Sequence, residues 1–164
     1  MEEQVLLSAP KGDGRFVIVC DASDYGIGAA LLQLQGDELV VLEFGSKTLS
    51  SVEKNWHTFG KEAFAIRWAV ERFADYIRTG NILVLTDSKN LEWMCNSTKG
   101  KVRRWSLYLQ QFDLEIKHIS GQENGLADWL SRSVDESDDL FNDMEDVEIP
   151  QFNIHDDSPV VQEQ

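Results

Sequence analysis

The sequence predicts an α/β domain with a mixed five-stranded sheet, three antiparallel strands followed by parallel strands, flanked by helices. Two short apolar runs, residues 16–20 and 82–85, each lead into an aspartate, Asp21 and Asp87. Runs of this length, rich in β-branched residues and bounded by turn residues, are typical of strands buried on both faces. A strand–helix–strand connection makes the two strands parallel. Both aspartates are therefore expected at the carboxyl edge of the sheet, where α/β proteins bind ligands.

The first half of the sheet is predicted to be an antiparallel meander. The strand at 16–20 is followed by an apolar segment at 27–34, which reads as the second strand. A Gly-Asp pair at 36–37 marks a hairpin turn, and the third strand covers 39–44 with a pattern that extends toward residue 47. These three strands precede any helical periodicity.

The longest helix is predicted to begin at a capping box, Ser50-x-x-Glu53. Apolar residues then recur at alternating spacings of four and three, which defines a single buried stripe on one helix. The stripe consists of Phe59, Ala63, Ile66, Val70, Phe73 and Ile77. We expect this helix to end near Thr79, with Gly80 as its C-cap, and to lead into the strand at 82–85.

The second half of the domain is predicted to alternate short helices with the last strand. Ser88 is placed to cap a short helix, and an amphipathic helix follows with an apolar stripe from Val102 to Phe112. Alternating residues at 114–119 predict a half-exposed edge strand, and a final helix is expected at 124–131.

The acidic residues are distributed unevenly along the 164-residue chain. The formal net charge is −14, but residues 135–164 hold 11 of the 29 acidic residues and no Lys or Arg. The rest of the chain therefore carries 18 acidic against 15 basic residues. We interpret 1–15 as an N-terminal linker, 16–132 as the domain, and 133–164 as an acidic, disordered tail. The tail is either a solvated linker or a mimic of nucleic-acid phosphates.

The few cysteines and histidines exclude a disulfide-stabilised domain and a domain built around a Cys/His metal site. Two cysteines, Cys20 and Cys95, are too few for a disulfide framework, and the three histidines are too scattered for a Cys/His metal site. No apolar run approaches the length of a membrane span, and the acidic N-terminus lacks a signal region. These features predict an intracellular protein that is not secreted and has no membrane partner.

Four carboxylates on four predicted elements form a candidate catalytic constellation. Asp21 and Asp87 end two strands, Glu62 lies at the margin of the long helix's apolar stripe, and Asp128 lies on the last helix. Carboxylate oxygens are ligands for hard cations such as Mg²⁺, and two-metal phosphodiester hydrolysis needs several of them at one point. An aspartate after a strand is also a common turn former or helix cap, so spacing alone leaves both interpretations open.

Several short motifs follow one another in a characteristic order between Phe16 and Arg132. They are Asp21-Ala22-Ser23-Asp24-Tyr25-Gly26-Ile27-Gly28-Ala29, Ser46-Lys47-Thr48-Leu49, Glu53-Lys54-Asn55-Trp56, Lys61-Glu62, Thr86-Asp87-Ser88-Lys89-Asn90-Leu91, Arg104-Trp105 and Gly121-Gln122-Glu123-Asn124-Gly125-Leu126-Ala127-Asp128-Trp129-Leu130-Ser131-Arg132. In these motifs and their spacing the chain resembles the ribonuclease H domain of reverse transcriptases, most closely that of gypsy-type long-terminal-repeat retrotransposons. The resemblance covers about seven-tenths of the chain.

The resemblance implies a ribonuclease H-like fold and a two-metal nuclease site. In that family, the acids matching Asp21, Glu62, Asp87 and Asp128 hold two Mg²⁺ ions, for which Mn²⁺ can substitute, and cut the RNA strand of an RNA–DNA hybrid. It also implies a parent polyprotein with a polymerase region and an integrase. The location would then be a cytoplasmic virus-like particle or the nucleus.

The resemblance also bears on three further positions. His118 stands ten residues before Asp128, where related enzymes place a histidine on a mobile loop that helps product leave, but it also fits a solvent-facing edge strand. Ser88 and Asn90 replace the family's common His and Pro, which we expect to alter a helix cap and not the metal site.

The expected substrate contacts are few, which predicts weak and salt-sensitive binding of the hybrid. Lys99, Lys101, Arg103 and Arg104 form a basic cluster, in which the two arginines either contact phosphates or lie on a solvated helix face. Asn124 either contacts substrate or caps the last helix. Two rival functions remain: a non-catalytic or domesticated module that binds nucleic acid or protein, and DNA cleavage by an integrase-like member of the fold.

Overall fold

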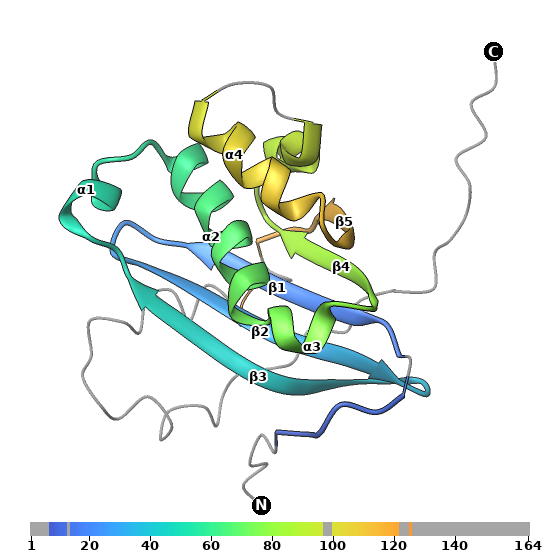
Figure 1. The fold of residues 1–164 in the computed structure, drawn as a ribbon. Coiled ribbons are helices and arrows are strands. Elements are labelled where there is room, and N and C mark those ends of the chain that lie inside the picture. The colour runs from blue at the N-terminus through green and yellow to red at the C-terminus, as the bar shows by residue number, and fades with distance from the viewer. Residues whose placement is uncertain (1–6, 13, 97–99, 122–124, 126–164) are drawn as a thin grey trace, which may run out of the picture.

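The five predicted strands are present and form one mixed sheet. The computed structural model describes residues 7–12, 14–96, 100–121 and 125. The strands are β1 (Phe16–Ala22), β2 (Gly26–Gln35), β3 (Glu38–Thr48), β4 (Asn81–Thr86) and β5 (Asp113–His118). Their order across the sheet is β3-β2-β1-β4-β5 (Figure 1).

The pairing of the strands confirms the predicted topology. β1 and β2 pair antiparallel, as do β2 and β3, and the tight turn between β2 and β3 contains Gly36 at φ +66°. A positive φ of this size favours glycine, which lacks a Cβ. β4 pairs parallel with β1 on one side and with β5 on the other. β5 is an edge strand of the sheet, as its half-exposed pattern predicts.

The helices lie together over one face of the sheet (Figure 1). They are α1 (Ser51–Lys54), α2 (Thr58–Arg72), α3 (Ala74–Ile77) and α4 (Gly100–Leu109), with a 3₁₀ helix, η1 (Lys89–Asn96), between β4 and α4. The capping box at the start of α1 is confirmed. The Glu53 N–H donates to the Ser50 hydroxyl at 3.2 Å, and the Ser50 N–H donates to the Glu53 carboxylate at 3.0 Å.

The prediction of one continuous helix from Ser50 to Gly80 is wrong. The first break separates α1 from α2, and the second falls at Phe73, whose φ of −99° and ψ of 9° leave the helical region. The chain continues through a tighter turn, in which the Tyr76 N–H donates to the Phe73 carbonyl at 3.0 Å. Apolar spacing does not reveal such breaks, because α3 still buries Ile77 on the same side as α2.

Two details of the predicted helix are also wrong. Phe59 was expected in the buried stripe but is 41% exposed, because it lies in the first turn of α2, beyond the part of the helix that covers the sheet. Gly80 does not cap the helix: α3 ends earlier, with Arg78 as its C-cap in a right-handed helical conformation.

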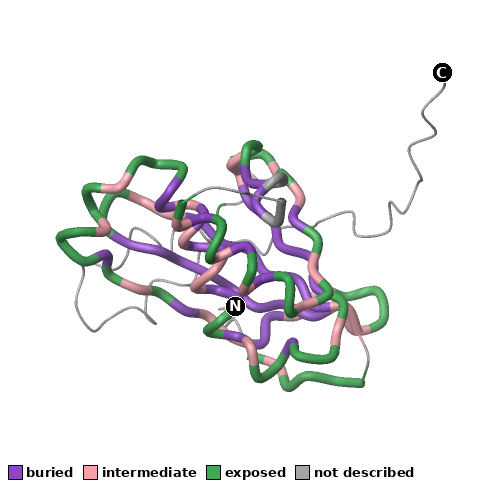
Figure 2. The backbone as a smooth tube through the Cα atoms, turned by 45° about the horizontal axis from the view of Figure 1, so that its top comes forward, coloured by how far each residue is buried: buried purple, intermediate pink, exposed green. Residues whose placement is uncertain are grey.

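The sheet carries a hydrophobic cluster on each face, since successive side chains of a strand point to opposite sides. Ile18 and Cys20 of β1 belong to the cluster beneath the helices, which also contains Ile66 of α2. Val17 and Val19 of β1 belong to the cluster on the opposite face. Figure 2 shows the corresponding continuous buried path along the central strands. Cys20 is 1% exposed, as expected for a strand buried on both faces.

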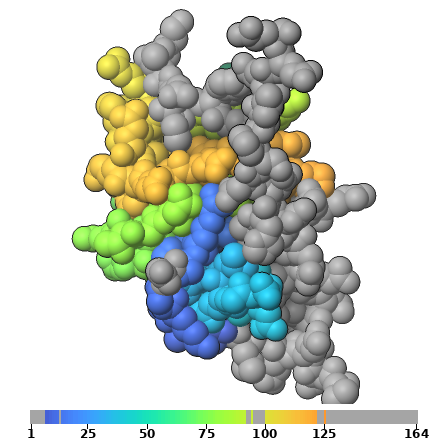
Figure 3. All heavy atoms as spheres, turned by 90° about the vertical axis from the view of Figure 1, so that its right-hand side faces the viewer, coloured from blue at the N-terminus to red at the C-terminus, as the bar shows by residue number. Residues whose placement is uncertain are grey.

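The segment before β1 is attached to the sheet. The fully buried Gln33 side chain receives the Lys11 N–H at 2.9 Å and donates to the carbonyl of Lys11 at 3.0 Å and of Gly14 at 3.1 Å. Arg15 forms an ion pair with Glu115 of β5 at 3.2 Å. Figure 3 shows this N-terminal segment at the end of the molecule where the β2–β3 hairpin and β5 also lie.

Two predictions concern parts of the chain outside the described residues. These are the last helix at 124–131 and the disordered tail at 133–164. Among the described residues, no helix combines the length and apolar character needed to cross a bilayer.

Candidate metal centre

The two predicted strand-end aspartates lie side by side because of the parallel register of β1 and β4. Val19 is aligned with Leu85 in that pairing. Asp21 comes two residues after Val19, and Asp87 comes two residues after Leu85, so both reach the same level of the sheet edge. Asp21 is only 8% exposed, whereas Asp87 is half-buried.

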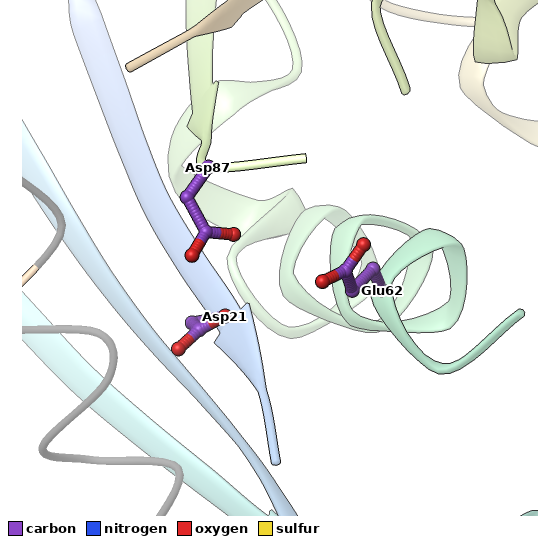
Figure 4. A group of neighbouring side chains, drawn as sticks. All are labelled: Asp21, Glu62 and Asp87. Atoms are coloured by element: carbon purple, nitrogen blue, oxygen red, sulfur yellow. The ribbon is translucent and has the colours of Figure 1, made fainter. Parts of the chain in front are cut away.

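The third acid comes from the helix that covers this edge. Glu62 is in the second turn of α2, and its carboxylate points toward the two aspartates (Figure 4). One carboxylate oxygen from each of Asp21, Glu62 and Asp87 lies within 4.8 Å of the others. The structure therefore brings together three of the four predicted acids, from two strand ends and a helix that are far apart in sequence.

The pKa of Glu62 is raised above its ordinary value, chiefly because burial disfavours the charged carboxylate. A hydrogen bond from the Ser88 side chain acts in the opposite direction, and the negative charge of Asp87 adds to the increase. Burial also raises the pKa of the neighbouring Cys20 thiol, with further contributions from Asp21, Asp87 and Glu62. Cys20 itself lies in the core cluster beneath the helices.

These three carboxylates suit a divalent cation bound by oxygen ligands. Three acidic oxygens converge from separate rigid elements, and like charges at this separation repel each other. The negative charge of Asp87 contributes to the raised pKa of Glu62, and a bound cation would oppose that contribution. The donor set, made of carboxylates without Cys or His, matches hard ions such as Mg²⁺ and Mn²⁺.

Asp128, the fourth predicted acid, and Asn124 lie outside the described residues. His118 is the last residue of β5, aligned with Thr86 of β4, and its side chain is exposed. Since Asp87 directly follows Thr86, His118 stands at the same sheet edge as the acids. Its assignment to the reaction stays a prediction.

Ser88 was expected to affect only a helix cap, and this expectation is wrong. Its side chain forms a hydrogen bond to Glu62, one of the three clustered acids. Its backbone holds the local turn: the Ser88 N–H donates to the Thr86 hydroxyl at 3.2 Å, and the Ser88 carbonyl accepts the Leu91 N–H at 3.0 Å. Serine at this position therefore contacts one of the three clustered acids directly.

Of the predicted basic residues, Lys99 lies outside the described residues, and the other three lie on α4 but are not equivalent. Arg103 and Arg104 are exposed, whereas Lys101 is half-buried with its Nζ 3.5 Å from the centre of the Trp56 ring. Burial lowers the pKa of Lys101. Trp56 packs against Trp105 with ring centres 5.7 Å apart, and Trp105 contacts the core.

A buried lysine beside the acids was missed by the sequence analysis. Lys61 directly precedes Glu62 and is 7% exposed, with its Nζ 3.3 Å from a carboxylate oxygen of Asp24 in the β1–β2 turn. Position 61 lies outside the apolar stripe of the helix, which predicts an exposed side chain. Its burial depends on the turn that packs against it, so no sequence signal reveals it.

The sheet order, the helices on it and the acidic edge together define a ribonuclease H-like fold. Comparison with known proteins confirms this class: residues 12–112 match the family described as "RNase H-like domain found in reverse transcriptase". The chain belongs to this family, and the predicted resemblance is confirmed.

The curated relatives include two retroelement polyproteins of Drosophila melanogaster. The retrovirus-related Pol polyprotein from transposon 297 is 35% identical over 129 residues, and that from transposon gypsy is 33% identical over 133 residues. The matches cover 77% and 79% of this chain, respectively, and 12% of each polyprotein. The chain thus spans about an eighth of the length of these relatives.

Solved structures show the same fold at low sequence identity. RNase H1 of the halophilic archaeon Halobacterium salinarum has a TM-score of 0.54 at 20% identity, over 74% of this chain and 96% of the archaeal chain. The foamy viral protease-reverse transcriptase in complex with an RNA/DNA hybrid also has a TM-score of 0.54 at 20% identity. That match covers 81% of this chain and 22% of the viral chain.

Proposed function

We propose that this domain is an endonuclease that hydrolyses the RNA strand of RNA–DNA hybrids during retrotransposon reverse transcription. The observation that carries the proposal is the convergence of Asp21, Glu62 and Asp87 within 4.8 Å at the carboxyl edge of the sheet. Membership of the reverse transcriptase RNase H-like family supports the choice of substrate. The fold neighbour that carries an RNA/DNA hybrid supports it further.

In this proposal, the acids hold two Mg²⁺ ions, for which Mn²⁺ can substitute. When bound, the ions supply the positive charge that activates a water molecule and stabilises the departing 3′ oxygen. Asp21, Glu62 and Asp87 are the proposed ligands, with Asp128 as the fourth. The roles of these residues are to fix the ligand oxygens in space and to exclude alternative geometries. The products would carry 3′-hydroxyl and 5′-phosphate ends.

Substrate contacts are proposed for residues around this edge. The exposed Arg103 and Arg104 on α4 are proposed to contact phosphates. The Lys101 ammonium, which is held over the Trp56 ring, is a third proposed contact. Asn124 is proposed as a further contact, and His118 as an aid to product release. The polymerase region and integrase of a parent polyprotein are the proposed partners, in keeping with the Pol polyproteins that this chain matches.

Cleavage of a labelled RNA–DNA hybrid tests the proposal directly. The full chain is incubated with the hybrid in Mg²⁺ and separately in Mn²⁺, with Asp87→Asn as the site variant. We expect RNA-strand cleavage that the variant loses while it keeps the wild-type circular dichroism spectrum. Asp75→Asn is the matched control, because Asp75 is an exposed aspartate in α3, away from the acids.

The result also separates the proposed nuclease from its rivals. Hybrid binding without cleavage in either metal, by folded protein, would refute the nuclease proposal and favour a non-catalytic binding module. Cleavage of duplex DNA in place of the RNA strand would favour an integrase-like activity.

A further inference from the structure

Lys61 is a buried charge that the proposed chemistry does not use. Only 9% of its side chain is exposed, although it carries an ammonium group on the helix that also holds Glu62. A buried lysine is stable when it has an ionic partner, and Asp24 provides one at 3.3 Å. Asp24 itself keeps 85% of its side chain exposed. In this ion pair, Lys61 is therefore buried in the protein and Asp24 lies at the surface.

This ion pair joins α2, which carries Glu62, to the turn that follows β1, the strand that carries Asp21. Lys61 immediately precedes Glu62 on α2, and Asp24 follows Asp21 by three residues, in the turn that β1 enters. A displacement of α2 from this turn would separate Glu62 from Asp21. The pair therefore acts at the junction on which the spacing of the metal centre depends.

The turn is rigid enough to transmit this constraint. The Ser23 hydroxyl accepts the N–H of Gly26 at 3.1 Å, and the Ser23 N–H donates to the Gly26 carbonyl at 2.8 Å. The Tyr25 carbonyl in turn accepts the N–H of Leu49, at the end of β3, at 2.8 Å. Asp24 is therefore held by a closed hydrogen-bonded turn that is itself tied to the sheet.

We propose that Lys61 is a positioning residue for the metal centre. Its ion pair with Asp24 holds α2 against the β1–β2 turn, so that Glu62 and Asp21 stay within coordinating reach despite their mutual repulsion before a cation binds. The inference rests on the proposed function only in taking the three acids as metal ligands; it does not depend on which nucleic acid is cut.

The affinity of the Lys61→Met variant for a metal ion gives the decisive test. A purely electrostatic role and a positioning role of Lys61 predict changes of opposite sign in that affinity. Loss of a nearby positive charge by itself strengthens binding of a cation. Loss of a positioning contact weakens it, by about tenfold if the effect matches that of outer-shell partners in other metal sites. Methionine keeps the apolar stem of the side chain. The dissociation constant for Mn²⁺ is measured on the full chain from the electron paramagnetic resonance signal of free Mn²⁺.

Two further variants complete the design. Asp24→Asn breaks the same pair from its exposed end and keeps the Lys61 side chain intact. We expect it to weaken Mn²⁺ binding as Lys61→Met does. Arg72→Gln is the matched control: Arg72 pairs with Glu43 at 3.2 Å and also ties α2 to the sheet, at the end of the helix away from the acids. We expect it to change Mn²⁺ affinity by less than about twofold, because this partly exposed pair lies at the other end of α2.

The outcomes distinguish this inference from the proposed function. Unchanged or tighter Mn²⁺ binding by Lys61→Met, or unchanged binding by Asp24→Asn, would overturn the positioning role. A wild-type chain that binds Mn²⁺ normally but cuts no hybrid would refute the nuclease and leave the positioning role intact. A wild-type chain that binds no Mn²⁺ would refute the metal centre itself. Urea unfolding without metal identifies any variant whose fold is lost.

Discussion

Replacing Glu62 by Gln should stabilise the metal-free protein, although it removes a proposed metal ligand. The substitution keeps the shape of the side chain and an oxygen that can accept the hydrogen bond from Ser88. It removes a negative charge whose pKa is raised in the folded state, chiefly by burial and further by Asp87. Clustered carboxylates repel one another when no cation is bound, and this variant removes one of the repelling charges.

The magnitude follows from the separation of the acids. At the 4.8 Å that bounds the cluster, Coulomb's law gives about 1 kcal/mol per pair in water and about 3.5 kcal/mol at an effective dielectric of 20. Glu62 is half-buried, so screening by solvent is partial. We expect Glu62→Gln to raise the free energy of unfolding by about 1–3 kcal/mol at pH 7 without metal.

The stability difference between Glu62→Gln and wild type should depend on pH in one direction. A carboxyl whose pKa is higher in the folded than in the unfolded state opposes folding once it ionises. That penalty is absent below the ordinary pKa of 4.5 and is fully present above the raised pKa of folded Glu62. The advantage of Glu62→Gln over wild type should therefore grow as the pH rises from about 4 to 7.

Urea unfolding in a chelator, at pH 4 and pH 7, measures both quantities. Glu71→Gln is the matched control on α2, since Glu71 pairs with Arg67 and its neutralisation should destabilise the protein slightly. With saturating Mn²⁺ the wild type should become more stable than Glu62→Gln. Only the wild type gains the full binding free energy, about 2.7 kcal/mol at a Mn²⁺ concentration of a hundred times the dissociation constant. If Glu62→Gln is less stable than wild type at pH 7 without metal, the electrostatic argument is wrong.

Three other predictions concern the site, the substrate surface and the N-terminal segment. Ser88→Ala removes the hydrogen bond that lowers the pKa of Glu62, so the acid limb of the pH profile for Mn²⁺ binding should move to higher pH; no shift would contradict this role. Arg103→Gln with Arg104→Gln should weaken hybrid binding and reduce the slope of log K against log salt by about 2, measured by fluorescence anisotropy. An unchanged slope would exclude them as phosphate contacts. Gln33→Leu leaves the backbone groups of Lys11 and Gly14 without their partner, and should lower the free energy of unfolding by about 1–3 kcal/mol in urea; equal stability would count against the attachment.

Local patterns were sufficient to predict the sheet and the two aspartates. The apolar runs that end at Asp21 and Asp87 define strands whatever packs around them, and the helix between them makes the strands parallel. The capping box at Ser50 involves only residues three apart, so it too was readable from the sequence. The position of Glu62 beside the stripe of α2 placed it within reach of the same edge.

The breaks in the helix and the surroundings of the acids were not predictable in this way. The conformation of Phe73 departs from a helix while the apolar spacing continues unchanged, so periodicity conceals the break. Ser88 resembled a helix cap because the sequence shows its neighbours along the chain and not Glu62 across the edge.

The sequence by itself determined the strands of the sheet and the presence of Asp21, Glu62 and Asp87 at its edge. It did so because strand and helix periods, caps and turns depend on residues close together in the chain. Only the tertiary structure decided that Lys61 is buried against Asp24 and that Ser88 bonds to Glu62. Those contacts join residues 26 to 37 positions apart, and their existence depends on how α2 packs against the strand ends. Burial and electrostatics of this kind arise only when the elements are assembled.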